Sequence, residues 1–105
     1  MYLISVNVGQ ERSIQIGKQA EMTGIYKTPA SGPVAITADG VAGDAVVDTE
    51  NHGGADQAVY VYGAPDYAWW AAQLGCEVEP GTFGDNLTVS DLESAALAVG
   101  DLLQV

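Results

Sequence analysis

Glycines recur between short apolar runs, and this spacing limits what the chain can fold into. The 105 residues include 13 glycines and 4 prolines, and both residue types interrupt regular elements. Runs with alternating or apolar character lie between them and predict strands at 2–8, 13–16, 23–28, 34–37, 57–62, 88–89, 97–99 and 102–105. We therefore expect a mostly β fold, a barrel or sandwich that carries one helix.

The predicted helix covers residues 65–74. Pro65 suits the first helical turn, and Gly75 is a typical stop. Within this stretch, apolar side chains recur at the spacing of one helical face, at Tyr67, Trp70, Ala71 and Leu74. We expect this stripe to pack on the sheet.

The charge balance excludes several classes of partner. Fourteen acidic residues against three basic ones give a formal net charge of −11, which repels nucleic acid and anionic membrane surfaces. We expect no membrane span, because an apolar run of about 20 residues is missing, and no signal peptide, because the N-terminus lacks a basic region. We expect a cytoplasmic protein forming one domain over residues 1–105, with the lone Cys76 outside any internal disulfide.

The segment around His52-Gly53-Gly54 is the strongest local motif. Two adjacent glycines allow close backbone approach, so the loop could present amides and an imidazole to an anion. It could instead be a tight turn entering a strand, with His52 or Asp56 bonding to loop amides, and residue chemistry alone favours that reading.

Three further groups of residues have side chains that could take part in chemistry. Lys27 could bind a phosphate as a point charge, although a solvated lysine that offsets the acidic surface is the simpler reading. Asp44 and Asp48 could divide acid and base roles, although turn capping is simpler. Cys76 is followed by Glu77 and lies in an acidic setting, which does not favour a reactive thiolate.

Taken together, the motifs resemble the MOSC family, the domains similar to the C-terminal part of molybdenum-cofactor sulfurase. The resemblance is to small stand-alone bacterial members, including the 6-hydroxylaminopurine reductase type. It rests on a run of segments in order: Val6–Gly9, Thr23–Pro29, Gly32–Val34, Asp39–Asp44, His52–Val59, Tyr62, Tyr67, Pro80–Leu87 and Gly100–Asp101.

This resemblance implies a MOSC-like β-barrel and a pocket for molybdenum cofactor (molybdopterin). It implies that Lys27 lies near the pterin phosphate, that Asp44 and Asp56 brace the loops, and that the cofactor pocket is lined by Lys27, His52, Gly53, Gly54, Phe83 and Asn86. The family's catalytic cysteine follows the Gly-Asp strand, and Cys76 precedes it, so we assign no catalytic residue and no metal ligand.

Two functions follow as expectations. The first is a MOSC-type domain that binds a small molecule or cofactor but lacks catalysis on its own, because the family's C-terminal segment is absent. The second is a non-enzymatic truncated barrel that acts as a binding or assembly module. In either case the apolar strand expected at 102–105 predicts a homo-oligomer, because an open edge is a template for pairing.

Overall fold

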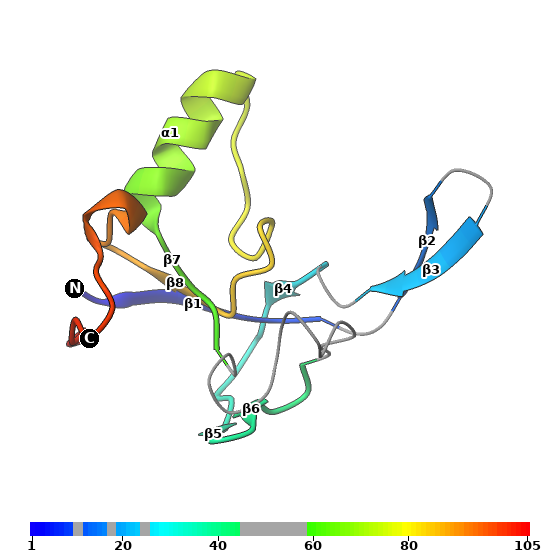
Figure 1. The fold of residues 1–105 in the computed structure, drawn as a ribbon, viewed down its shortest axis with the longest axis horizontal. Coiled ribbons are helices and arrows are strands. Elements are labelled where there is room, and N and C mark those ends of the chain that lie inside the picture. Colours follow the sequence, from blue (N-terminus) through cyan, green and yellow to red (C-terminus); the bar gives the residue numbers. More distant parts are fainter. Residues whose placement is uncertain (10–11, 17–18, 24–25, 45–58) are drawn as a thin grey trace.

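The computed structural model describes residues 1–9, 12–16, 19–23, 26–44 and 59–105, and within 12–16 and 19–23 it describes the backbone alone. Figure 1 shows the elements, which in chain order are β1 (Leu3–Val8), β2 (Arg12–Ile16), β3 (Gln19–Thr23), β4 (Thr28–Pro29), β5 (Ile36–Thr37), β6 (Gly40–Val41), β7 (Val61–Gly63), α1 (Ala64–Leu74), β8 (Leu87–Val89) and a 3₁₀ turn at Ser94–Ala96. The expected mostly β fold with one helix is therefore confirmed.

The central sheet has the strand order β4-β1-β8-β7. β1 pairs antiparallel with both β4 and β8, whereas β7 and β8 run parallel. Parallel neighbours need a crossover connection, and α1 supplies part of it. Pro29 lies in β4 at the edge of the sheet, where a residue without an N–H group is tolerated.

Two hairpins accompany this sheet. β2 pairs with β3 in continuous antiparallel register, and β5 pairs with β6 across a tight turn. Gly40 has a φ of 128° at the end of that turn, a backbone conformation that favours glycine.

The helix begins and ends as its sequence predicts. Gly63 is the N-terminal cap, Pro65 lies in the first turn, and Gly75 ends the helix with a left-handed φ of 71° and an N–H bond to Ala71. Tyr67 is buried, but Leu74 at the far end of the predicted stripe is exposed. The helix therefore packs through its N-terminal half, and its last turn extends beyond the sheet (Figure 1).

Among the residues whose burial the structure describes, the core has as many polar as hydrophobic members. Its buried hydrophobic residues are Val41, Tyr67, Val89 and Leu92, and its buried polar residues are Asn7, Asp85, Asn86 and Thr88. Buried polar groups are costly unless they are hydrogen-bonded, and in the described residues every buried side-chain nitrogen and oxygen has a partner. The interior is therefore held by hydrogen bonds as well as by apolar packing.

Three predicted strands were wrong. In the 23–28 segment, β3 ends at Thr23 and β4 begins only at Thr28. The segments 97–99 and 102–105 lie outside any strand, because the chain turns at Gly100 with a φ of 95° and the Asp101 N–H bonds to Ala98. Apolar composition alone did not make these segments strands. A strand also needs a neighbour to pair with, and none of the described strands pairs with either segment.

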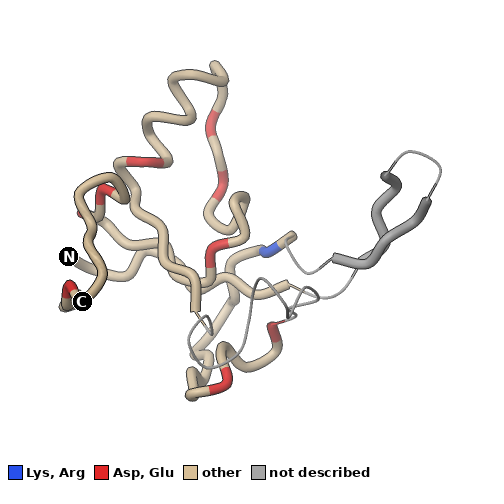
Figure 2. Tube along the Cα trace, in the orientation of Figure 1, with Lys and Arg blue, Asp and Glu red and all other residues tan. Residues whose placement is uncertain are grey.

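The acidic character is distributed over the fold. Figure 2 shows acidic residues on α1, on the loop that follows it and close to the C-terminus. Among the described residues, the helix is too short to cross a lipid bilayer.

Candidate functional site

Asp44 is the centre of a buried polar network. Its Oδ1 atom accepts the Gly9 N–H at 2.9 Å, and the Lys27 ammonium donates to both oxygens at 2.6 and 2.7 Å. Oδ2 also accepts from the Asn86 amide at 2.7 Å. The Lys27 and Asp44 side chains are only 6% and 4% exposed, so this is a buried, charge-assisted contact.

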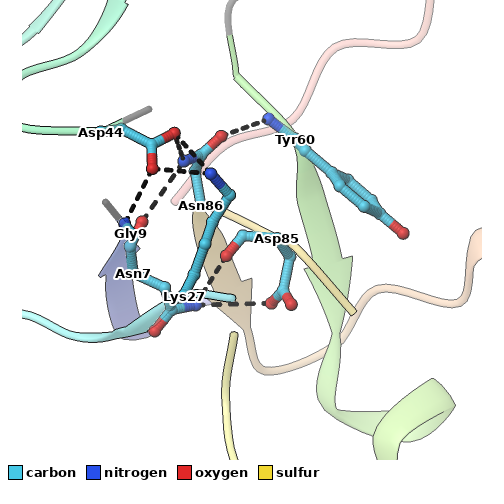
Figure 3. A network of polar contacts seen from close by, with 7 residues as sticks. All are labelled: Asn7, Gly9, Lys27, Asp44, Tyr60, Asp85 and Asn86. Atoms are coloured by element: carbon cyan, nitrogen blue, oxygen red, sulfur yellow. Dashed lines mark hydrogen bonds and ion pairs between the residues drawn. The ribbon is translucent and has the colours of Figure 1, made fainter. Parts of the chain in front are cut away.

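The Asn86 side chain extends the network in two further directions (Figure 3). Its Nδ2 group donates to the Asn7 carbonyl at 3.3 Å as well as to Asp44. Its Oδ1 atom accepts the Tyr60 N–H at 3.0 Å, while the Tyr60 ring points away from the network. One amide thus joins three segments that are distant in sequence, and both of its N–H donors are used.

A second cluster lies beside the first and centres on Asp85. Tyr67 donates its hydroxyl to Oδ1, and Thr88 donates to Oδ2 at 2.7 Å. Asn7 donates to the Asp85 carbonyl and to the Thr88 hydroxyl, both at 3.0 Å. Since Asn7 and Asp85 are fully buried, this cluster fixes β1 to the start of β8.

Burial raises the pKa of Tyr67, and its hydrogen bond to Asp85 raises it further. The same hydroxyl accepts the Gly81 N–H at 2.9 Å. Gly81 has a φ of 89°, and a Cβ atom there would lie 2.6 Å from the Lys27 carbonyl oxygen. The 80–86 loop therefore packs directly on the backbone of Lys27.

Phe83 belongs to a cluster of aromatic rings. Its ring centroid lies 5.4 Å from Tyr62, 5.2 Å from Tyr67 and 5.7 Å from Trp70. The Trp70 indole N–H also donates to the Tyr62 hydroxyl at 3.1 Å. Such edge-on and tilted contacts stabilise the packing of the 80–86 loop against α1.

The structure brings some of the expected site residues together and leaves others untested. Lys27 and Asn86 share the Asp44 carboxylate, and Phe83 lies in the same loop as Asn86. The expectation that Lys27 is a solvated lysine was wrong, since its side chain is buried against Asp44. His52, Gly53, Gly54, Asp48 and Asp56 lie outside the described residues.

Cys76 is exposed and free. Within the described part of the chain, no group of three or more His, Cys, Asp or Glu side chains could hold a metal ion.

Sequence reasoning missed the role of Asn7. The alternation in 2–8 placed it on the polar face, yet Asn7 is buried while Tyr2, Leu3 and Ile4 are exposed. No local signal indicated this, because the Asn7 side chain donates to Asp85 and Thr88, which lie 78 and 81 positions further along the chain.

Comparison with known proteins supports the resemblance. The sequence model of the family described as "MOSC domain" matches residues 48–105, more than half of the chain. The uncharacterised protein YflK of Bacillus subtilis is 36% identical over 98% of this chain. A protein of Gibberella moniliformis named "Reductase" is 29% identical, also over 98% of this chain.

One solved structure is similar as well. The crystal structure of YiiM from Geobacillus stearothermophilus matches with a TM-score of 0.53 and 25% identity over 85% of this chain. The chain spans 47% of YflK, 18% of the reductase and 37% of the YiiM chain, so it matches less than half of each protein.

Proposed function

Because the chain belongs to the MOSC domain family, we propose that it is a MOSC-type domain of the molybdenum-cofactor class that does not catalyse a reaction by itself. One relative is named a reductase, which supports a link to redox proteins. The observation that supports the lack of catalysis is that Lys27 and Asn86 both donate to Asp44, and that all three side chains are buried. In this arrangement the three side chains are directed at one another's segments and not at a substrate, which favours a structural role for them.

We infer that Lys27, Asn86 and Phe83 do not hold the cofactor directly. The Lys27 ammonium is paired with Asp44, and both Asn86 donors are used inside the fold. The Phe83 ring packs on Tyr62 and Tyr67. Other residues would then contact the cofactor. Three candidates from the sequence, His52, Gly53 and Gly54, lie outside the described residues.

Expression in a host that makes molybdenum cofactor tests this proposal. We expect molybdenum to co-purify with the chain, measured by elemental mass spectrometry, without reduction of an N-hydroxylated base such as 6-hydroxylaminopurine. The matched control is Cys76→Ser, which removes the exposed thiol and should leave both results unchanged. Turnover that the control variant loses would contradict the proposal.

A second candidate is a non-enzymatic assembly module that forms a homo-oligomer. Several large apolar side chains near the C-terminus are exposed, namely Leu97, Val99, Leu102, Leu103 and Val105. Exposed apolar patches often mark interaction sites, so these side chains are the candidate contact residues. A chain that self-associates and carries no molybdenum under the same expression conditions would favour this candidate over the first.

A further inference from the structure

The donors around Asp44 come from three separate parts of the chain. The Gly9 N–H follows β1, the Lys27 ammonium precedes β4, and the Asn86 amide precedes β8. All three point at one carboxylate (Figure 3). Such convergence of a cation, a backbone amide and a side-chain amide is the arrangement by which proteins bind carboxylate and other small anions.

Asp44 fills this arrangement completely. A carboxylate has about four acceptor positions, and the four contacts here divide equally between its oxygens: Gly9 and Lys27 on Oδ1, Lys27 and Asn86 on Oδ2. The side chain is 4% exposed. Within the described residues, these contacts already use about as many acceptor positions as the carboxylate has.

The geometry points to a carboxylate cradle, formed by Gly9 N–H, Lys27 and Asn86, whose resident anion is Asp44. Lys27 and Asn86 are then positioning residues that hold β1, β4 and β8 together through Asp44, and the Lys27 ammonium does not serve an external phosphate. The inference uses the same Lys27, Asp44 and Asn86 contacts as the proposed function, but its formate test depends on neither molybdenum binding nor turnover.

The cradle makes a specific prediction about its empty form. Asp44→Ala keeps the Cβ atom and removes only the carboxylate. The removed group has the size and charge of formate, so formate should fit the space that it leaves. We expect formate to restore the stability that the variant loses, and acetate to do so less well because of its extra methyl group. Phosphate is larger and tetrahedral, so any stabilisation it gives should be the general effect of a kosmotropic salt, equal in the parent chain, Asp44→Ala and Asp39→Ala.

Thermal unfolding at constant ionic strength, with chloride as the reference anion, tests the inference. The midpoint of Asp44→Ala should rise with formate concentration by about 4 °C or more at saturation, and the Gly9 amide proton should shift in the same titration. Asp39→Ala removes an exposed carboxylate and is the matched control, which formate should leave unchanged. The double variant Lys27→Met/Asp44→Ala should lose the formate effect, because the cation is gone.

Two results would overturn the cradle. One is phosphate stabilisation of the parent chain that Lys27→Met abolishes, because Lys27 would then serve an external anion. The other is an Asp44→Ala chain that formate fails to stabilise. If that variant does not fold in chloride, its refolding yield in formate is the readout, and equal failure in both salts counts against the cradle.

Discussion

A Cβ atom placed on Gly63 would lie 1.7 Å from the carbonyl oxygen of Leu92. Gly63 is the last residue of β7 and the cap of α1, while Leu92 is part of the buried core. The backbone of one strand end therefore packs directly on the loop after β8, with no room for a side chain.

Gly63→Ala should destabilise the fold because the clash is with backbone, which cannot rotate away. We expect a loss of about 1–3 kcal/mol in the free energy of unfolding, measured by denaturant titration. Gly32→Ala is the matched control, since a Cβ atom there meets nothing within 4 Å. The control should change stability by less than about 0.5 kcal/mol, and equal losses in both variants would refute the packing argument.

Tyr67→Phe should cost stability at neutral pH. Removing the hydroxyl leaves the Gly81 N–H without its acceptor and takes one donor from the buried Asp85 carboxylate. We expect a loss of about 1–3 kcal/mol. The exposed Tyr2→Phe variant controls for removal of a hydroxyl, and a loss as large there would show that the buried contact is not the cause.

Because the pKa of Tyr67 is raised in the folded chain, the stability of the fold should fall at alkaline pH. In the unfolded chain the Tyr67 hydroxyl loses its proton near the ordinary tyrosine pKa of about 10. In the folded chain the same hydroxyl keeps its proton to higher pH. The stabilisation is therefore fully present below about pH 10 and is lost as pH rises above it, by at most about 1.4 kcal/mol per pH unit. Unfolding measured from pH 8 to 11 should show this loss in the parent chain and a shallower loss in Tyr67→Phe, and parallel profiles would contradict it.

The exposed apolar side chains near the C-terminus predict self-association. Val99 and Leu102 are almost fully exposed, so aspartate at both positions should not disturb the core but should abolish an apolar contact between copies. Sedimentation at micromolar concentration should show a species heavier than 10.9 kDa for the parent chain and a monomer for Val99→Asp/Leu102→Asp. A parent chain that sediments as a monomer would rule out the assembly candidate.

The elements with local signals were predictable from the sequence. The alternation in 2–8 anticipated β1, and Pro65 with Gly75 anticipated α1, because caps and periodicity act over a few residues. The ends of strands were less predictable. Pairing with strands that are distant in sequence decides where a strand ends. The segment 102–105, for example, has the composition of a strand but pairs with none of the described strands.

The polar network was predictable only in part. Resemblance suggested that Asp44 braces loops, and its contacts with Gly9 and Asn86 agree with that role. Nothing local to Lys27 indicated that its ammonium would be buried against a residue 17 positions away. Such long-range ion pairs follow from the topology of the sheet and not from sequence spacing.

The most direct test of the account is a double-mutant cycle between Lys27 and Asp44. Lys27→Met and Asp44→Asn, singly and together, give the coupling energy from denaturant unfolding, and a second cycle with the exposed Asp39→Asn serves as the control. A buried pair that holds three segments together predicts a coupling of about 2 kcal/mol or more, with less than about 0.5 kcal/mol in the control cycle. A Lys27–Asp44 coupling below about 0.5 kcal/mol, as found for exposed ion pairs, would contradict the account.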